Sequence, residues 1–400
     1  MPMTRGSTAA ISCDLLIVGA SFAGLVAART AALRGLNVVV LEAKRDVGAR
    51  VATTGILVKE AAEELDLPHW LTRRVHGVRL YSPSLRHIDL HAPGYYFLTT
   101  DTPNVLRWLA EEAERAGARI LRGRRFAAAE RTEQGFRIAG PEDIATRFIL
   151  GADGARSAVA RAFKLGTNTR FLVGLEAEYK VLDAGASGLL HCFLDSRLAP
   201  GYLAWVAPGP VVTQVGLAVT DGHRADLDAF RRHTDHLFGF SNGHIVERRA
   251  GRIPCGGIVQ PWAKPGVMLI GDAAGMVSPA TAGGIHQAFR FGRRAGQTIA
   301  DHLIHGAPEP HKVLAPELPQ FGKKMLMRAL LDCAPPNVLI DLAIATAPMR
   351  WLAARIYFHR RATASGVVLE PHPQAPHRLD PTKEPVHAMG HVPKIRRLDH

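Results

Sequence analysis

Three short segments of the sequence each place glycines beside an acidic side chain. They are Gly19-Ala20-Ser21-Phe22-Ala23-Gly24 with Glu42 after it, Gly151-Ala152-Asp153-Gly154, and Gly271-Asp272-Ala273-Ala274-Gly275. Glycine lets a backbone turn tightly and approach a ligand closely, and a carboxylate can accept hydrogen bonds from sugar hydroxyls. These residue types in this pattern indicate a site for a ligand that carries phosphates and hydroxyls.

The first segment has the form of a dinucleotide-binding turn. Gly19 permits the turn, the small Ser21 lets the backbone approach a pyrophosphate, and Gly24 lets the next helix pack closely on the strand. The positive end of that helix favours phosphate. The residues expected to hold the dinucleotide here are Gly19, Ser21, Phe22, Ala23, Gly24, Glu42, Ala43 and Arg50. Arg50 could equally be a solvated surface side chain.

The third segment extends the prediction from a dinucleotide to a flavin. A strand ends in Gly271-Asp272, which places a carboxylate where the hydroxyls of a ribityl chain could be bound. Pro279 and two glycines then lead into a helix whose N-terminus could stabilise negative charge on a reduced flavin ring. The residues expected at the cofactor from the second and third segments are Asp153, Gly154, Gly271, Asp272, Gly283, Gly284 and Ile285. The predicted cofactor is noncovalent FAD.

Strands and helices must alternate around these segments to position them. Short apolar runs at 14–18, 37–41, 148–150 and 267–270 are typical of buried parallel strands, and helical patterns occupy 22–34, 105–115 and about 284–302. Between about 170 and 260 the apolar residues alternate with polar ones, as at 189–194 and 211–219, which indicates an antiparallel sheet.

Together, the three segments resemble the flavin motifs of the p-hydroxybenzoate-hydroxylase-like flavoproteins. Within that superfamily the sequence is most similar to the geranylgeranyl reductases, through Gly271-Asp272-Ala273-Ala274-Gly275, Pro279 and Gly283-Gly284-Ile285. The resemblance covers roughly residues 13–305. It implies a FAD-dependent oxidoreductase in which a sheet-like substrate domain covers the reactive face of the flavin.

The resemblance also implies substrate residues. The stretch Pro200-Gly201-Tyr202-Leu203-Ala204-Trp205-Val206-Ala207-Pro208 is similar to the family's Tyr-x-Trp-x-Phe-Pro element, which lines an isoprenoid channel. Tyr202, Trp205 and Pro208 are therefore the implied substrate residues. Tyr202 and Trp205 could equally be core aromatics of a half-buried sheet.

The sequence departs from the family pattern at several positions. One extra residue separates Tyr202 from Trp205, and Ala207 stands in place of the phenylalanine. Family members often carry a cysteine near Thr54-Gly55, and this sequence has none there. The arginine that usually precedes the helix at 105–115 is also missing, and Asp101 lies nearby instead. Within the flavin motifs, Ser21 stands where the fingerprint has its middle glycine.

The predicted fold is α/β, with a Rossmann-type FAD-binding domain, an inserted antiparallel β-sheet substrate domain and a helical C-terminal region. The FAD-binding domain is discontinuous and comprises 13–60, 95–165 and 260–305, and the substrate domain comprises 61–94 and 166–259. Residues 306–370 form the helical region, and 371–400, rich in Pro, His, Lys and Arg, form a tail.

Composition limits the partners. The formal net charge of +13 favours anionic partners such as phosphate-bearing cofactors and acidic lipids, and no nucleic-acid partner is predicted. The four cysteines form no CxxC pair and the nineteen histidines show no metal spacing, so reduced thiols and no metal are expected. The chain has no secretory signal and no long uncharged apolar stretch, which predicts a cytoplasmic protein.

Other side chains carry weaker indications. His286, at the start of a predicted helix, could donate a proton near the flavin or make only a polar contact at the helix start. His191 and Cys192 lie on alternate faces of a strand, so one of them is expected to face the substrate. The apolar region 338–358, interrupted by arginines, fits either helices packed on the core or a basic amphipathic surface that contacts the inner face of the membrane.

These features leave several functions open. The first is reduction of C=C bonds in a prenyl or other hydrophobic substrate by hydride from reduced FAD. The second is a flavin monooxygenase that hydroxylates or epoxidises a hydrophobic or aromatic substrate, and the third is a flavin- or lipid-binding protein without catalysis. A halogenase is disfavoured because no Trp-x-Trp-x-x-Pro element is present. No second GxGxxG unit exists, so the electron donor is transiently bound NAD(P)H or a small redox protein.

Overall fold

A computed structural model describes residues 11–140, 143–180, 182, 188–344 and 346–358. The predicted tail at 371–400 lies outside the described residues. The α/β fold class, with a Rossmann-type core, an antiparallel sheet and C-terminal helices, is confirmed. The predicted domain boundaries remain a prediction.

A first sheet forms the Rossmann-type core. Its strands lie in the order β17 (Ala263–Lys264), β18 (Val267–Leu269), β11 (Ile144–Gly151), β1 (Ile11–Val18), β2 (Val38–Glu42) and β8 (Arg119–Arg122), with β10 (Gly135–Ile138) beside β11 and β9 (Glu130–Thr132) beside β10. β18, β11, β1, β2 and β8 run parallel to one another, whereas β17 and β10 pair antiparallel with β18 and β11. Every residue of β2 is buried, which explains its continuous apolar run up to Glu42.

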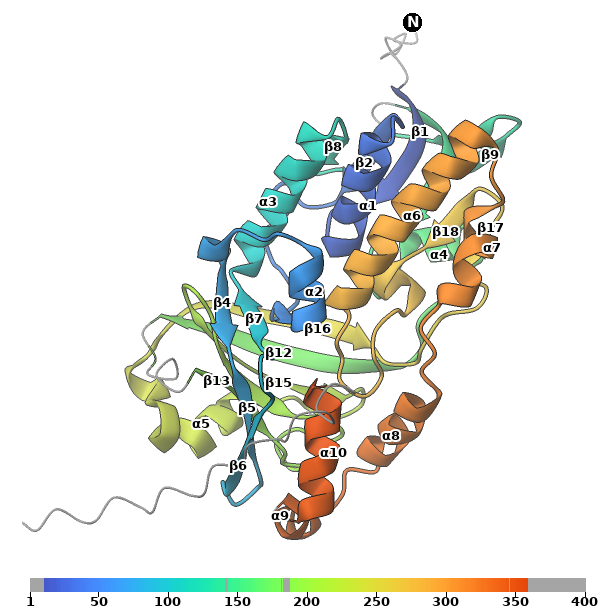
Figure 1. The fold of residues 1–400 in the computed structure, drawn as a ribbon. Coiled ribbons are helices and arrows are strands. Elements are labelled where there is room, and N and C mark those ends of the chain that lie inside the picture. Colours follow the sequence, from blue (N-terminus) through green and yellow to red (C-terminus); the bar gives the residue numbers. More distant parts are fainter. Residues whose placement is uncertain (1–10, 141–142, 181, 183–187, 345, 359–400) are drawn as a thin grey trace, which may run out of the picture. The chain divides into compact units, whose positions relative to one another are not determined.

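Helices pack on one face of this sheet. α1 (Phe22–Leu33) contacts both α3 (Thr102–Arg115) and α6 (Ile285–His305), and Figure 1 shows the three side by side. Gly292 and Gly296 of α6 face α1 so closely that a Cβ atom on either would lie 2.7–2.8 Å from the carbonyl oxygen of Ala23 or Ala27. These glycines therefore set the distance between the helices.

Shorter helices and turns complete this region. They are α2 (Lys59–Glu64), which contacts α6, α4 (Ala158–Ala162), and the 3₁₀ turns η1 (His69–Leu71) and η4 (Gly271–Ala274). A small sheet of β3 (Ile56–Val58), β7 (Phe97–Thr100) and β4 (Thr72–Val75) connects the core to the second sheet.

The second sheet is mainly antiparallel. Its strands lie in the order β16 (His244–Pro254), β12 (Phe171–Lys180), β15 (Thr213–Thr220), β14 (Ala204–Pro208), β13 (Leu189–Phe193), β5 (Gly77–Tyr81) and β6 (His87–His91). β5 and β6 come from a much earlier part of the chain, and β13 pairs with β5 in parallel. The antiparallel sheet predicted for about 170–260 is confirmed, and it extends further than the alternating pattern predicted.

The two faces of the second sheet have different neighbours. Residues such as Tyr179 and Leu217 pack against α5 (Leu227–Phe238) and the turn η3 (Phe240–Asn242). The opposite face, called the front face below, carries Glu176, Gly216, Trp205 and Cys192 in one row of the strand register. One face of the sheet is therefore covered by α5, and the front face carries both apolar and polar side chains.

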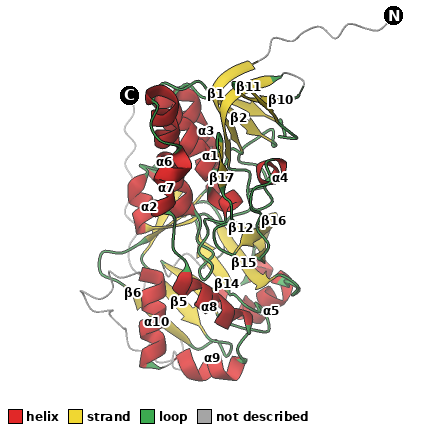
Figure 2. Ribbon diagram, turned by 90° about the vertical axis from the view of Figure 1, so that its right-hand side faces the viewer, coloured by secondary structure: helices red, strands yellow, loops and turns green. Residues whose placement is uncertain are grey.

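The C-terminal region is helical as far as residue 358, as predicted, and residues 359–370 of the predicted helical region lie outside the described residues. It contains α7 (Pro310–Leu314), the turn η5 (Ala315–Glu317), α8 (Gly322–Asp332), α9 (Asn337–Ile344) and α10 (Ala347–Phe358). Figure 2 shows α8 and α10 next to the strands of the second sheet, and the buried Phe358 of α10 packs in the cluster that contains Cys192.

Candidate functional site

The first glycine segment forms the turn between β1 and α1. Gly19 has φ +105°, a conformation that side chains disfavour, and a Cβ atom there would overlap the carbonyl oxygen of Ala152. A Cβ atom on Gly24 would overlap the carbonyl oxygen of Gly19. Only glycine fits both positions, and the first and second segments are therefore in direct contact.

The helix that follows offers free donors to an anion. Ser21 is the N-cap of α1, its exposed side chain makes no capping hydrogen bond, and the first turn carries no acidic residue. Phe22 and Ala23 begin the helix and are buried. The N–H groups of the first turn are thus left for a ligand such as a pyrophosphate.

Glu42 is buried at the end of β2 and holds the turn in place. Its carboxylate accepts hydrogen bonds from the backbone N–H of Ala20 and of Lys44, both at 2.8 Å. A carboxylate has further lone pairs, so these two bonds leave capacity for ribose hydroxyls. Ala43 and Arg50 follow it as exposed residues.

One carboxylate oxygen of Asp153, in the second segment, stabilises the start of a helix. Its Oδ2 accepts hydrogen bonds from the backbone N–H of Ala158 at 2.6 Å and of Val159 at 3.1 Å, and so caps α4. Its Oδ1 is buried without a hydrogen-bond partner among the described residues. Gly154 follows with φ +80°. The unpartnered oxygen is the part of Asp153 that remains for a ligand.

The third segment meets the first. A Cβ atom on Gly271 would lie 3.1 Å from the Cβ atom of Ala23, and one on Gly284 would lie 3.4 Å from Oδ1 of Asp272. The Asp272 side chain is open to solvent, yet the surrounding protein atoms are dense enough that burial raises the pKa of its carboxyl to about 6. The carboxyl is therefore surrounded by protein and still open to a ligand from solvent.

The start of α6 is also uncapped. Gly284 is its N-cap, no side chain caps the helix, and Ile285 begins it without an acidic residue in the first turn. Gly283 lies immediately before it, next to the hydroxyl of Thr281. The positive end of α6 therefore lies beside Asp272.

These features fit a flavin dinucleotide. The glycine turns leave no room for side chains but bring backbone donors together, two helix N-termini lack caps, and Glu42 and Asp272 retain acceptor capacity. A family profile described as an FAD binding domain matches residues 12–174. The digeranylgeranylglycerophospholipid reductase of Methanothrix thermoacetophila is 32% identical over 317 residues, which cover 74% of this chain and 79% of that protein.

The chain belongs to the geranylgeranyl reductase family of FAD-dependent oxidoreductases. A digeranylgeranylglycerophospholipid reductase of Methanothermobacter thermautotrophicus is 29% identical over 321 residues, covering 73% of this chain and 78% of that protein. The predicted family and the predicted cofactor, FAD, are confirmed.

Solved structures support the fold. A geranylgeranyl bacteriochlorophyll reductase-like protein from Thermoplasma acidophilum matches with a TM-score of 0.76 at 21% identity, over 88% of this chain and 98% of that chain. A flavin-dependent brominase matches with a TM-score of 0.67 at 15% identity, over 87% of this chain and 94% of that chain. At these identities the likeness shows a shared architecture.

The two aromatic residues implied by the family resemblance lie on the front face of the second sheet. Tyr202 and Trp205 pack in one cluster with Ala218 and Ala282, and the Tyr202 hydroxyl donates a hydrogen bond to the carbonyl oxygen of Thr281 at 2.6 Å. Ala282 directly precedes Gly283 of the third flavin segment. The structure thus places this aromatic pair beside the loop that leads into α6.

The Trp205 ring depends on a neighbouring glycine. It lies over Gly216 on β15, where a Cβ atom would overlap the indole, and its Nε1 donates to Oε2 of Glu176 at 3.1 Å. Pro208, the third implied substrate residue, is buried at the end of β14, and its carbonyl oxygen accepts a hydrogen bond from Thr99 at 2.6 Å. Pro208 thus links the second sheet to β7.

The choice between His191 and Cys192 is resolved by the strand register. Cys192 pairs with Trp205 and lies on the front face, where burial raises the pKa of its thiol to about 11. His191 points to the opposite face, where its ring contacts Phe238, and burial lowers its pKa to about 4. The neutral thiol of Cys192 is therefore an apolar component of the front face.

His286 is engaged away from this aromatic pair. Its Nε2 lies 3.0 Å from Oε1 of Glu64 on α2, and Arg293 donates to the carbonyl oxygen of Glu64 at 2.7 Å. His286 thus makes a polar contact with Glu64 at the start of the helix. Proton donation by His286 remains a prediction.

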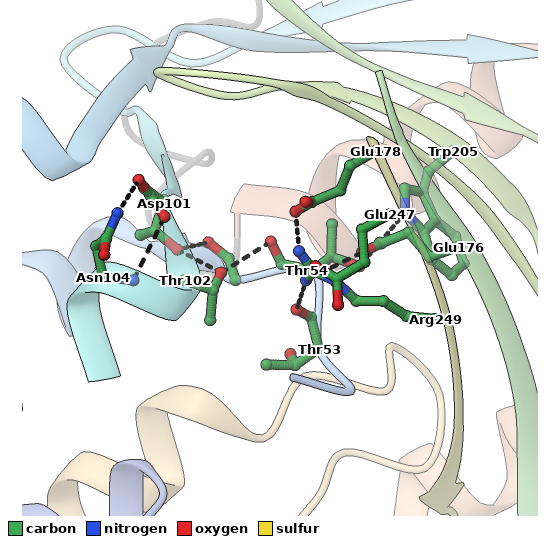
Figure 3. A network of polar contacts seen from close by, with 12 residues as sticks. Thr53, Thr54, Asp101, Thr102, Asn104, Glu176, Glu178, Trp205, Glu247 and Arg249 are labelled. Atoms are coloured by element: carbon green, nitrogen blue, oxygen red, sulfur yellow. Dashed lines mark hydrogen bonds and ion pairs between the residues drawn. The ribbon is translucent and has the colours of Figure 1, made fainter. Parts of the chain in front are cut away.

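Sequence reasoning did not identify a polar cluster on the front face (Figure 3). Glu176, Glu178 and Arg249 are all buried there, and Thr54 donates to Glu176 from the loop before β3. One sequence feature could have predicted this cluster: Glu176 and Glu178 stand two positions apart, and so on one face of a strand, in the otherwise apolar run at 171–179. Among the described residues, no group of three His, Cys, Asp or Glu side chains is arranged to hold a metal.

Proposed function

We propose that this FAD-dependent oxidoreductase reduces C=C bonds in the prenyl chains of a lipid. The observation that carries the proposal is the 32% identity to a digeranylgeranylglycerophospholipid reductase over 79% of that protein's length. The apolar part of the front face beside the third flavin segment, with Tyr202 and Trp205, offers a surface of suitable chemistry for a prenyl chain.

We further propose which residues hold the cofactor. The turn from Gly19 to Gly24 would bind the pyrophosphate, Glu42 the adenosine ribose, Asp272 the ribityl chain, and the N-terminus of α6 the pyrimidine edge of the flavin. When bound and reduced, FAD supplies the hydride. The protein orients the prenyl chain and keeps water out.

The test uses photoreduced enzyme without oxygen. Mixing it with digeranylgeranylglycerophospholipid in detergent should reoxidise the flavin and yield a lipid heavier by two hydrogen atoms for each reduced double bond, measured by mass spectrometry. Reoxidation only in the presence of oxygen, with oxygen uptake matching substrate consumption and an oxygen atom in the product, would instead establish a monooxygenase.

The electron donor can be identified in the same preparation. NADPH, NADH and a reduced ferredoxin, each added alone to the oxidised enzyme, should differ in the rate at which they bleach the flavin. We propose a transiently bound NAD(P)H or a small redox protein as donor, because the sequence contains no second GxGxxG unit besides the turn at Gly19 that we assign to FAD.

We also propose peripheral contact with a membrane. Large apolar side chains are exposed on the C-terminal helices, namely Leu326 and Leu330 of α8, Val338, Leu339 and Leu342 of α9, and Trp351 and Leu352 of α10. The exposed Lys323 and Arg355 flank them. No helix of the described residues is long and apolar enough to cross a bilayer. An anionic lipid surface fits this combination and would also deliver the substrate.

A further inference from the structure

The polar cluster on the front face has a buried carboxyl at its centre. Thr54 Oγ1 lies 2.5 Å from Glu176 Oε2, and Trp205 Nε1 donates to the same oxygen at 3.1 Å. Figure 3 shows Thr54 between the start of α3 and the strands that carry Glu176 and Trp205. Glu176 is therefore connected both to the loop at 52–55 and to the proposed substrate surface.

The charges of this cluster do not balance when all groups are ionised. Arg249 forms an ion pair with Glu178, and its Nη1 lies 3.6 Å from Oε1 of Glu176. The exposed fractions of the three side chains are 4% for Arg249, 7% for Glu176 and 9% for Glu178. Two buried carboxyls thus share one guanidinium, and burial strongly disfavours the uncompensated negative charge.

One bound proton would neutralise the pair of carboxyls, and the geometry indicates where it resides. Glu178 contacts the guanidinium directly, whereas Glu176 is farther away and its Oε1 has no hydrogen-bond partner. Burial raises the pKa of Glu176 in spite of the opposing contributions of Thr54, Arg249 and Trp205. The third acidic group at Arg249, Glu247, is 37% exposed, so solvent stabilises its charge.

The cluster also lies where a proton would be needed. Trp205, which donates to Glu176, packs in one cluster with Tyr202 and Ala282, directly before Gly283 at the start of the flavin helix. Loop 52–55 lies over the same face, because a Cβ atom on Gly251 would be 3.0 Å from that of Ala52. Thr54 and Trp205 thus meet at the same oxygen of Glu176, beside the proposed substrate surface.

We propose that Glu176 is the proton source for the reduction and that the hydroxyl of Thr54 delivers the proton to the substrate carbon. This inference rests on the proposed function. The π electron pair of the C=C bond forms a C–H bond with the Thr54 proton, while the other carbon accepts the hydride supplied by the reduced cofactor. For this step the hydrogen bond is reversed relative to the structure: protonated Oε2 of Glu176 donates to Oγ1 of Thr54 and passes its proton to it as the Thr54 proton leaves. The resulting carboxylate accepts hydrogen bonds from Thr54 and Trp205 and is stabilised by Arg249 until solvent reprotonates it.

Isosteric variants test the transfer. Glu176→Gln keeps an acceptor for Thr54 and Trp205 but cannot supply a proton, so flavin reoxidation by digeranylgeranylglycerophospholipid should slow by about 10²-fold while the affinity for FAD is retained. Thr54→Val should slow reoxidation by a similar factor. Thr54→Ser keeps the hydroxyl, so its reoxidation rate should be at least about tenfold higher than that of Thr54→Val. Wild-type reoxidation by the Glu176→Gln enzyme would overturn the proposal.

A second measurement does not depend on turnover. The infrared difference between oxidised wild-type and Glu176→Gln enzyme at pH 7 should show the carbonyl band of a protonated carboxyl. Glu178→Gln should remove this band, because Glu176 alone can then ionise against Arg249, and should move the pH profile of reoxidation to lower pH. Glu247→Gln, the control at the same guanidinium, should leave the band in place.

Failure of lipid reduction and absence of the Glu176 proton would give different experimental results. A wild-type enzyme that leaves the lipid unreduced would contradict the proposed function, and the infrared comparison would still decide whether Glu176 holds the proton. Absence of the band from the wild-type difference spectrum would overturn the assignment of the proton to Glu176 even in an active reductase.

Discussion

Asp272 lies beside Gly284 at the start of α6, and burial raises the pKa of its carboxyl to about 6 from an ordinary value of 3.8. Because the folded state binds this proton more tightly than the unfolded chain, cofactor-free protein loses stability as pH rises through about 6. Asp272→Asn should therefore raise the melting temperature of the cofactor-free protein above pH 6 and have little effect near pH 4.

The same variant should bind FAD more weakly. The carboxylate can make charge-assisted hydrogen bonds to the ribityl hydroxyls, worth about 1.5–3 kcal/mol, so the dissociation constant measured by flavin fluorescence should rise about 10- to 100-fold. Asp301→Asn, at the opposite end of α6 in an exposed pair with Arg34, is the matched control. Unchanged FAD affinity in Asp272→Asn would remove Asp272 from the site.

The Trp205 ring can be displaced without being deleted. A Cβ atom on Gly216 would overlap the indole, so Gly216→Ala should move the ring and slow flavin reoxidation by the lipid while FAD stays bound. Gly174→Ala, in the same sheet, is the control, because its nearest neighbours would be 3.8 Å away. Flavin content and stopped-flow reoxidation measure the two effects separately.

Trp205→Ala distinguishes packing from substrate binding. If the indole only fills the core, truncation should lower the free energy of unfolding by about 3–5 kcal/mol and leave reoxidation per folded molecule unchanged. We expect a smaller loss of stability and a larger loss of rate, because Trp205 is only partly buried. Thermal melts and single-turnover kinetics on one preparation decide between these outcomes.

At the residue scale, the sequence predicts contacts that depend on local geometry and misses those that depend on register. Gly19, Gly24 and Glu42 lie in one β-α-β unit, so their spacing alone brings them together. Glu178 and Arg249 are 71 residues apart and meet only through the pairing of β12 with β16, which contains a shift after Glu178. No local pattern encodes such a shift.

At the element scale, the close contact between α1 and α6 links the cofactor turn to the flavin helix. Gly296→Ala would place a Cβ atom 2.8 Å from the carbonyl oxygen of Ala27 and force the helices apart. We expect a loss of about 1–3 kcal/mol in the free energy of unfolding, together with lower FAD content, measured by denaturant titration and absorbance.

A control glycine in another helix should respond differently. Gly322 begins α8 with no atom near its missing Cβ position, so Gly322→Ala should leave stability unchanged or slightly higher. Equal losses in both variants would indicate a general effect of the substitution, contrary to the proposed role of the close approach at Gly296.

Some strands are predicted clearly by the sequence pattern, and others are not. β1 and β2 are continuous apolar runs, because each is buried on both faces of a parallel sheet. β5 and β6 are short and contain arginine and histidine, and the partner strand β13 comes much later in the chain. The sequence analysis assigned residues 61–94 to the substrate domain, but it did not predict these two strands or their pairing with β13, because that pairing is long-range.

For the whole molecule, the exposed apolar side chains of α8 to α10 predict a measurable affinity for membranes. Wild-type protein should float with vesicles that contain anionic lipid, and binding should fall with added salt because a surface charge near such lipids contributes about 1 kcal/mol per Lys or Arg. Leu339→Asp with Leu342→Asp should weaken flotation and leave reduction of detergent-dispersed lipid intact.

The matched control is Leu33→Asp, an exposed leucine at the end of α1 on the other side of the cofactor core. It should not alter flotation. Equal binding of wild type and the Leu339/Leu342 variant to anionic vesicles would contradict the proposed membrane surface.

The long-range pairing of the strands also bears on how a nascent chain acquires its cofactor. β1 pairs with β11, from Ile11 with Ile144 to Val18 with Gly151, and the flavin helix begins only at Ile285. At a synthesis rate of about 5–20 residues per second, the glycine turn leaves the ribosome many seconds before Asp272 and α6 can join it. The complete flavin site therefore forms only after α6 has been synthesised, and we expect stable flavin loading to be a late event.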